Sequence, residues 1–294
     1  MGLDDGVQIA TVNVNGVRAA FRRGMGAWLE ARRPDVVLLQ ETRSGEEHLR
    51  DHLDAGWHLA HAESDTRGRA GVAIASRLPM RAVRVGLDRS GSNSGRWVEA
   101  DLDLPGGEVL TVVSTYIHSG TLGTPSMAEK YVFLDLITAR LNELREAGDV
   151  VVGGDVNIAH RDVDLKNWKG NLDAAGCLPD ERAYLDRWFG AGWVDLGRRL
   201  GGPGPGPYTW WSWRGRAFDN DAGWRIDYQI ATPGLAVRAR SATVDRAASY
   251  ADRFSDHAPL VVDYDLPRPT PTPAAPGQAR ISPAPGLQTG HFGG

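Results

Sequence analysis

Four short polar motifs in this chain each stand at the end of a run of β-forming residues. They are Asn13-Val14-Asn15, Gln40-Glu41-Thr42, Gly153-Gly154-Asp155-Val156-Asn157 and Ser255-Asp256-His257. Strand ends are where a sheet presents side chains to a cleft, so motifs that are distant in sequence can meet at the rim of a sheet. The pattern therefore favours a strand-rich fold with one polar rim.

The residue types in these motifs suit metal-assisted cleavage of a phosphodiester. In-line attack on a phosphodiester needs a divalent cation held by hard oxygens, a base for the attacking water and a cationic group on the phosphoryl oxygens. Glu, Asp and Asn can provide the oxygens and the base, and His can provide the cationic group. No other set of residues in the sequence offers this combination.

Length and composition favour one large domain. The chain has 294 residues, 41% of them hydrophobic, and no linker-like stretch divides it before residue 265. We therefore expect residues 1–265 to form a single catalytic domain. Residues 266–294 are rich in Pro and Gly and cannot bury enough apolar surface to fold, so we expect a disordered tail there.

Other features of the composition concern location and partners. Cys177 is the only cysteine, no apolar run follows the N-terminus, and no stretch approaches the roughly 20 apolar residues of a membrane span. We expect a soluble, cytoplasmic monomer, associated with the nucleoid and not with a membrane. The net charge of −4 argues only weakly against a nucleic-acid substrate, because net charge says little about local patches.

Apolar periodicity predicts strands and helices that alternate along the chain. Strand-like runs cover residues 7–14, 36–39, 72–75, 97–104, 109–117, 150–152, 226–231 and 259–264. Helical patterns begin at about residue 25, at about residue 180 and at Ser126, where Glu129 completes a capping box. In the run 97–104 acidic and apolar residues alternate, which predicts a sheet with one solvent-exposed face. Together these patterns indicate an α/β sandwich with helices outside packed sheets.

Glu41, Asp155 and Asn157 are the first candidate site residues. Glu41 lies where a buried strand ends and could bind Mg²⁺ there, although a lone Glu at a strand end is more often a surface acid. Asp155 and Asn157 follow paired glycines that allow a sharp turn. Asp155 could accept a proton from water that Asn157 orients, but an Asx turn would explain the same pattern.

Asp227, His257 and Tyr116 form a second group of candidates. His257 precedes one strand-like run, and Asp227 lies in another run near the C-terminus. If the two side chains pair, the pKa of the imidazole rises and the ring stays protonated as a donor to a phosphoryl oxygen. Tyr116 ends a strand and could contact the phosphate, or it could be a core or rim residue.

Aromatic residues are dense in one part of the sequence. They are Tyr208, Trp210, Trp211, Trp213 and Trp224, with Arg residues between them. Flat rings beside cations suit a pocket for an unstacked sugar or base next to a phosphate. We expect part of this group to lie in the core and Trp210 and Trp224 to line the pocket.

The motifs, taken in order, resemble those of the exonuclease III family of apurinic/apyrimidinic endonucleases, within the endonuclease/exonuclease/phosphatase superfamily. The superfamily resemblance rests on Asn13-x-Asn15, Gln40-Glu41-Thr42, Tyr116, Gly154-Asp155-x-Asn157, Asp227 and Ser255-Asp256-His257. Three longer strings are similar to the family in particular. They are Asp164-Leu165-Lys166-Asn167-Trp168-Lys169-Gly170-Asn171, Tyr208-Thr209-Trp210-Trp211-Ser212-Trp213 and Gly223-Trp224-Arg225-Ile226-Asp227-Tyr228. The resemblance spans about residues 7 to 265.

The resemblance implies a role for each matched residue. The implied metal is Mg²⁺, with Mn²⁺ as an alternative, bound by Glu41 with Asn15 and Asp256 nearby. The implied catalytic residues are Asp155 as the acid that activates water, Asn157 as a positioning group, Asp227 and His257 as a pair on the phosphate, and Tyr116 as a phosphate contact. The implied DNA and substrate contacts are Asn13, Lys166, Asn167, Lys169, Asn171, Trp210, Trp211 and Trp224.

The resemblance also implies a fold and an activity. The fold is a four-layer α/β sandwich, in which two packed mixed β-sheets are flanked by helices and the site lies at one end. The activity is Mg²⁺-dependent hydrolysis of the phosphodiester 5′ to an abasic site in duplex DNA, with 3′→5′ exonuclease action and 3′-end trimming. The chain is thus expected to be a DNA repair enzyme, an exodeoxyribonuclease III or AP endonuclease, that binds duplex DNA at abasic sites or 3′ ends.

Two other functions stay open on the sequence alone. A hydrolase of the same superfamily could act on a phosphoinositide or on sphingomyelin, although such a small headgroup needs no backbone track like residues 166–171. A nucleic-acid-binding homologue could also have lost catalysis, although it would not need to keep all the candidate residues. Two positions depart from some relatives: Asn15 stands in place of Asp, and Ser119 in place of Asn.

Overall fold

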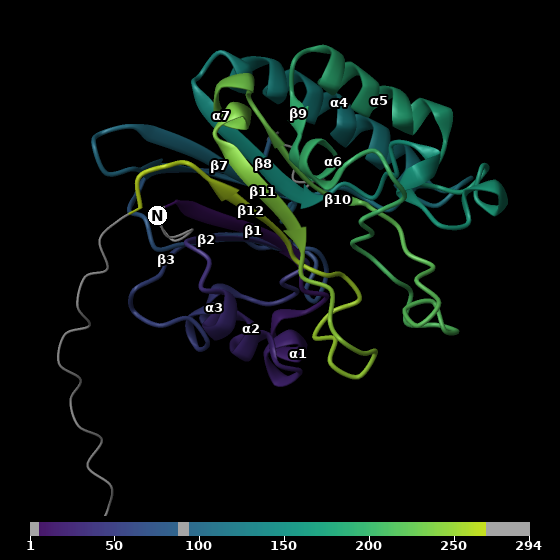
Figure 1. Ribbon diagram of the computed structural model, residues 1–294, viewed down its shortest axis with the longest axis horizontal. Coiled ribbons are helices and arrows are strands. Elements are labelled where there is room, and N and C mark those ends of the chain that lie inside the picture. Colours follow the sequence, from purple (N-terminus) through teal and green to yellow (C-terminus); the bar gives the residue numbers. More distant parts are fainter. Residues whose placement is uncertain (1–5, 88–93, 269–294) are drawn as a thin grey trace, which may run out of the picture.

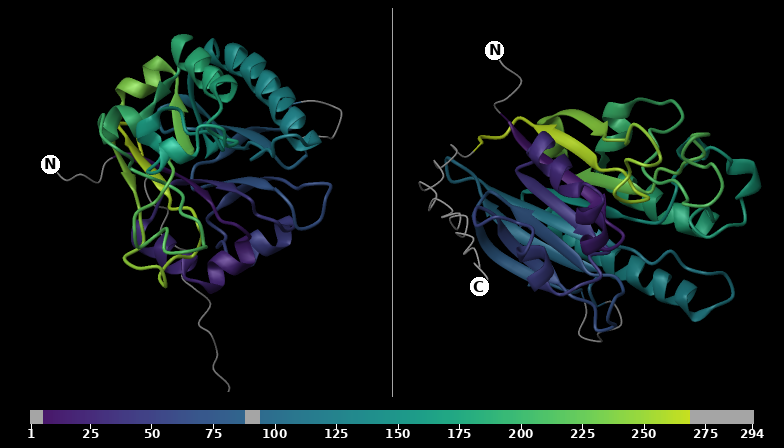
Figure 2. Two further views of the ribbon diagram at one scale, coloured as in Figure 1. Left: turned by 90° about the vertical axis from the view of Figure 1, so that its right-hand side faces the viewer. Right: turned by 90° about the horizontal axis from the view of Figure 1, so that it is seen from below.

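The computed structural model describes residues 6–87 and 94–268, to which the structural statements below refer. Two six-stranded sheets pack face to face, and helices cover the outer face of each sheet (Figures 1 and 2). Alternation of helices with strands along the chain produces these layers, because each element buries one apolar face. The expected four-layer α/β sandwich is confirmed.

The first sheet has the strand order β11-β12-β1-β2-β4-β3. Its strands are β1 (Val7–Asn13), β2 (Val36–Gln40), β3 (His58–Ala62), β4 (Val72–Ser76), β11 (Ala239–Val244) and β12 (Leu260–Tyr264). Strands β1 and β2 are parallel, and the other neighbours in this sheet are antiparallel. The sheet is therefore mixed and joins the two ends of the described chain.

The second sheet has the order β5-β6-β7-β8-β10-β9. Its strands are β5 (Met80–Val85), β6 (Trp97–Asp103), β7 (Val109–Tyr116), β8 (Asp149–Asp155), β9 (Val194–Asp195) and β10 (Asp227–Ala231). Here β7 and β8 are parallel, and the other neighbours are antiparallel. Both sheets are thus mixed, as expected.

Helices lie on both outer faces of the sandwich (Figure 1). The helices are α1 (Val17–Arg22), α2 (Met25–Arg32), α3 (Glu46–Arg50), α4 (Pro125–Arg145), α5 (Pro179–Gly190), α6 (Leu196–Gly201) and α7 (Pro233–Val237), with short 3₁₀ turns at Asp162–Asp164 and Trp168–Gly170. Helices α1 to α3 pack on the first sheet, and α4 and α5 pack on the second. Apolar residues of both sheets, such as Ile9, Leu38 and Val112, fill the space between them. None of the described helices is long and apolar enough to cross a membrane.

The register of the sheets places the polar motifs at one end of the sandwich. Asn13 lies opposite Gln40 at the ends of the parallel strands β1 and β2. Asp155 lies opposite Tyr116 at the ends of β7 and β8, and also opposite Asp227 at the start of β10. Because parallel strands end at the same edge of a sheet, the motifs come together without any long connection.

Two predictions about local structure are corrected. The expected capping box at Ser126 is absent: α4 begins at Pro125 after Thr124, and no side chain caps it. Proline is favoured at the first helical position because it has no N–H to satisfy and a fixed φ, so the helix starts one residue earlier. The expected solvent-exposed face of β6 is partly covered, since Glu99 is buried and paired with Arg84 and Arg140.

The predicted start of the tail at residue 266 is also corrected. Leu266 is 2% exposed and packs in the core between the sheets. Arg268 Nε donates to Asp35 Oδ1 at 2.8 Å. The folded part therefore continues to residue 268, and the rest of the predicted tail, 269–294, lies outside the described residues.

Candidate active site

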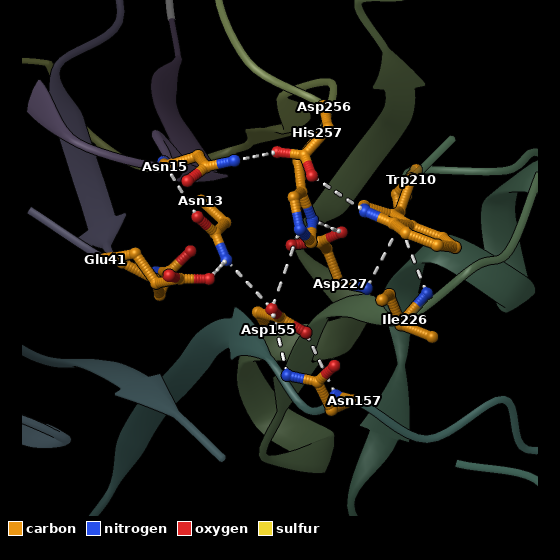
Figure 3. Close-up of polar contacts among 12 residues, drawn as sticks. Asn13, Asn15, Glu41, Asp155, Asn157, Trp210, Ile226, Asp227, Asp256 and His257 are labelled. Atoms are coloured by element: carbon orange, nitrogen blue, oxygen red, sulfur yellow. Dashed lines mark hydrogen bonds and ion pairs between the residues drawn. The ribbon is translucent and has the colours of Figure 1, made fainter. Parts of the chain in front are cut away.

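Asn13 links the two sheets at the polar rim. Its side-chain Nδ2 donates to Glu41 Oε1 at 2.8 Å and to Asp155 Oδ2 at 2.9 Å. Asn13 is fully buried at the end of β1, and Ser255 Oγ donates to its carbonyl oxygen at 2.6 Å. Figure 3 shows Asn13 between the two acids. The amide therefore fixes the relative positions of the candidate metal ligand and the candidate base.

Asp155 and Asn157 form a compact turn after β8. Asn157 donates to Asp155 through its backbone N–H at 3.0 Å and through its side-chain Nδ2 at 3.1 Å. Asn157 Nδ2 also donates to the carbonyl of Ile117 at 3.0 Å. Burial raises the pKa of Asp155 to about 7, with nearby Asp227 and Glu41 adding to the rise and His257 opposing it. A carboxylate with this pKa can accept a proton near neutral pH.

His257 and Asp227 form the buried pair that the sequence suggested. His257 Nδ1 lies 2.9 Å from Asp227 Oδ2, and His257 Nε2 lies 3.7 Å from Asp155 Oδ2. Burial alone would lower the pKa of His257, but the charges of Asp227 and Asp155 outweigh it and raise the pKa to about 10. The imidazole is therefore a cation at neutral pH, oriented by Asp227 and directed toward Asp155.

Asp256 faces the site from the motif that precedes β12. Its carboxylate accepts hydrogen bonds from Asn15 Nδ2 at 2.8 Å and from Trp210 Nε1 at 3.1 Å. Asn15 in turn donates its backbone N–H to Asn13 Oδ1 at 2.9 Å. Both predicted neighbours of the metal, Asn15 and Asp256, thus belong to one hydrogen-bonded network with Asn13 (Figure 3).

Tyr116 lies half-buried at the end of β7. Burial and the charges of Glu41 and Asp155 raise the pKa of its hydroxyl, so the phenol stays protonated as a donor. The guanidinium of Arg96 lies 4.9 Å from the ring centroid. Tyr116 is therefore near both candidate acids, Glu41 and Asp155.

The aromatic residues divide into two groups. Trp210 and Trp224 meet edge to face, with ring centroids 6.2 Å apart, and Trp210 also forms a β-bridge with His257. Both rings are half-buried, and Trp210 lies beside the pair of His257 and Asp227. Trp211, in contrast, is 1% exposed and packs against Phe218 in a separate cluster. The structure thus brings Trp210 and Trp224 to the site but buries Trp211, so the predicted substrate contact of Trp211 is wrong.

The predicted DNA-backbone segment lies next to Trp224. A β-bridge joins Leu165 to Trp224, and the N–H of Lys166 donates to the carbonyl of Gly223 at 3.1 Å. Lys166, Asn167 and Lys169 are exposed and Asn171 is half-buried. Positive and amide side chains therefore extend from the aromatic pair along the surface.

Two sets of side chains could hold a cation. Glu41, Asp256 and Asn15 offer oxygen donors only, and all three are partly accessible. Asp155, Asp227 and His257 place one ligand atom each within 4.8 Å of one another, but these groups are buried and one of them is a nitrogen donor. Mg²⁺ prefers oxygen ligands and keeps several waters, so the accessible oxygen set fits a magnesium ion better.

Three further residues of the site have contacts that the sequence did not predict. Thr209 Oγ1 accepts the N–H groups of Ile226 and Asp227, both at 3.1 Å, and so holds the start of β10. Lys130 reaches the Asn157 carbonyl from α4, and Arg96, the residue before β6, reaches Tyr116. The scarcity of lysine in this chain is the one sequence signal that could have indicated Lys130. No local sequence signal indicates these contacts for Thr209 or Arg96.

Comparisons with known proteins agree with this geometry. The profile described as "Endonuclease/Exonuclease/phosphatase family" matches residues 10–257. A DNA-(apurinic or apyrimidinic site) endonuclease from Dictyostelium discoideum is 28% identical over 264 residues, which cover 88% of this chain and 71% of that protein. An exodeoxyribonuclease from Bacillus subtilis is 28% identical over 258 residues, which cover 86% of this chain and 98% of that protein. The structure of a 3′ phosphatase, NExo from Neisseria, bound to a product DNA hairpin, is 26% identical with a TM-score of 0.77, covering 88% of this chain and 100% of that one.

Proposed function

This chain belongs to the endonuclease/exonuclease/phosphatase family, and we propose that it hydrolyses the phosphodiester 5′ to abasic sites in duplex DNA. The same site would remove nucleotides in the 3′→5′ direction and trim blocked 3′ ends. Relatives named as an apurinic endonuclease and an exodeoxyribonuclease support this reading. The observation that carries it is the arrangement in which Asn13 bridges Glu41 and Asp155, His257 lies 3.7 Å from Asp155, and Trp210 and Trp224 lie beside them.

Asp155 acts as the general base in this proposal. It is held by Asn13 and Asn157, and its pKa of about 7 matches a base that works near neutral pH. It takes the proton of the water that attacks phosphorus, and Asn157 orients that water. The attack breaks the bond between phosphorus and the 3′ oxygen of the preceding nucleotide. This oxygen leaves as an alkoxide and takes a proton from solvent water to become the 3′-hydroxyl.

His257 and Tyr116 bind the phosphoryl oxygens. The imidazolium is oriented by Asp227, so its Nε2–H can donate to a non-bridging oxygen without reorganisation. Tyr116 donates its hydroxyl to the same phosphate. Each such preorganised donor is typically worth on the order of 10² to 10³ in rate.

A divalent cation completes the charge balance. It would be held by Glu41 with Asp256 and Asn15 nearby, and it would neutralise negative charge on the phosphate. We favour Mg²⁺, with Mn²⁺ as a substitute, because every donor in this set is an oxygen.

The substrate is recognised by features outside the catalytic set. Trp210 and Trp224 would enclose the abasic sugar, and Lys166, Asn167, Lys169 and Asn171 would follow the DNA backbone. A lipid phosphoester would leave this exposed segment without a role.

The test compares substrate classes with one preparation of protein. An abasic duplex, a phosphoinositide and sphingomyelin are each incubated with Mg²⁺, with and without EDTA. We expect EDTA-sensitive incision of the duplex and no release of lipid phosphate. Turnover of a lipid substrate without incision of DNA would refute the proposal, and binding of the duplex without any cleavage would point to an inactive homologue.

A further inference from the structure

A buried ion pair connects the outer helices to the candidate active site. Lys130 of α4 and Glu181 of α5 are both 0% exposed, and Lys130 Nζ lies 2.5 Å from Glu181 Oε1. Burying two charges is costly, and well-packed apolar residues often stabilise a fold as well as such a pair does. The contacts that each partner makes beyond the pair are therefore the more informative feature.

The ammonium of Lys130 holds two segments of the site. Lys130 Nζ donates to the carbonyl of Asn157 at 2.9 Å and to the carbonyl of Ser119 at 3.2 Å. Together with the ion pair to Glu181, these two hydrogen bonds give the ammonium group three polar contacts. Asn157 adopts a left-handed φ of 53°, a conformation that Asn tolerates better than most residues, and the hydrogen bond from Lys130 holds its carbonyl group in place. Lys130 thus holds the backbone of Asn157, the residue whose side chain donates a hydrogen bond to Asp155.

The carboxylate of Glu181 holds a third segment. Glu181 Oε2 accepts the N–H groups of Gly176 at 2.6 Å and Leu178 at 3.1 Å. Gly176 lies so close to the site that a Cβ there would be 2.9 Å from the carbonyl oxygen of Asn157 and 3.3 Å from the ring of Trp224. The turn held by Glu181 therefore supports both the Asn157 peptide and the pocket tryptophan from behind.

We propose that Lys130 and Glu181 are positioning residues for the reaction. Lys130 acts through Asn157 on the base Asp155, and Glu181 acts through Gly176 on Trp224. The inference rests on the proposed function, because it assigns Asp155 as the base. A displacement of about 1 Å in an active site can cost about 10² in rate. Loss of the Lys130 contacts should therefore lower kcat strongly, although the carboxylates of the site are still present.

The experiment separates positioning from stability with three variants. Lys130→Met leaves Glu181 buried without its partner and should lower Tm the most. Lys130→Met/Glu181→Gln removes both charges, keeps an acceptor for Gly176, and should recover much of the Tm. Glu99→Gln is the matched control, because Glu99 is equally buried and paired with Arg84 and Arg140 on the outer face of the second sheet.

Two readouts are compared. On the abasic duplex, we expect the double variant to lose about 10² in kcat with KM changed less than about 3-fold, and Glu99→Gln to keep its kcat despite a lower Tm. Hydrogen exchange without substrate should speed up in the segment 155–160 of the double variant only. Wild-type kcat in the double variant, or an equal kcat loss in Glu99→Gln, would overturn the inference. Failure of the wild type to cut DNA would refute the proposed function alone, and the exchange data would then decide the positioning role.

Discussion

Replacing Asp227 by Asn should make the reaction dependent on pH in a way that the wild type is not. Asp227 Oδ2 lies 2.9 Å from His257 Nδ1, and its charge is the largest influence that raises the imidazole pKa against the effect of burial. At an effective dielectric constant of about 20, opposite charges about 3 Å apart attract by about 5 kcal/mol, or about 4 pKa units. Shifts of about 1 to 3 units are more usual for such pairs.

A loss of about 3 units would move the His257 pKa from about 10 to about 7. Below pH 6 the imidazole would still be protonated, so the variant should cleave nearly as fast as the wild type. At pH 8.5 only about one molecule in 30 would keep the proton, so the rate relative to wild type should fall about 30-fold. The deficit therefore grows as pH rises.

The measurement combines single-turnover cleavage from pH 6 to 9 with an NMR titration of ¹³C-labelled histidine, in which His257→Gln assigns the resonance. Asp186→Asn is the control, since Asp186 pairs with His160 at 2.8 Å but is half exposed and takes no part in the proposed reaction. A deficit in Asp227→Asn that is the same at every pH, or an imidazole pKa that stays at about 10, would refute the reasoning.

Four further predictions follow from the same contacts. Asp155→Asn should lower kcat by about 10² to 10⁴ while gel-shift affinity for the duplex survives, because the base is lost but the binding surface is not. Glu41→Gln should raise the Mg²⁺ concentration for half-maximal rate, and titration calorimetry with Mn²⁺ should show weaker binding; unchanged binding would contradict its role as ligand. Trp224→Ala should reduce kcat/KM for abasic duplex more than for a duplex with an intact 3′ end. Equal losses on the two substrates would contradict a role of Trp224 in the pocket for the abasic sugar. Leu266→Ala should lower the free energy of unfolding by about 2 to 4 kcal/mol in urea titrations, whereas no change would mean that Leu266 is not core.

The sequence predicted the layers of the fold, and it also indicated the polar side chains that the structure brings together at one rim. The prediction worked because the polar motifs end strands, and parallel strands deliver their ends to one edge, as the pairing of Asn13 with Gln40 and of Tyr116 with Asp155 shows. Strands β3, β5, β9 and β11 were not predicted, because they are short or lie at sheet edges where burial leaves a weak pattern.

Side-chain direction was the harder part. Trp210 and Trp211 are neighbours, and successive residues of an extended chain point to opposite sides, so one reaches the site and the other enters a separate core cluster. The sequence alone does not determine which of the two tryptophans faces the site. The left-handed backbone at Asn15, Glu41 and Asn157 was equally hidden, because hydrogen bonds between distant segments hold it.

The central claim is that one rim of the sandwich combines a cation site with a base for phosphodiester hydrolysis. Its most direct test is a Mg²⁺-supplemented digest of one duplex, prepared with and without a single abasic lesion and mapped at nucleotide resolution. We predict a cut immediately 5′ to the lesion that leaves a 3′-hydroxyl, lost with EDTA and in Asp155→Asn. Incision at the lesion by Asp155→Asn at the wild-type rate, or the same cut in EDTA, would contradict the account.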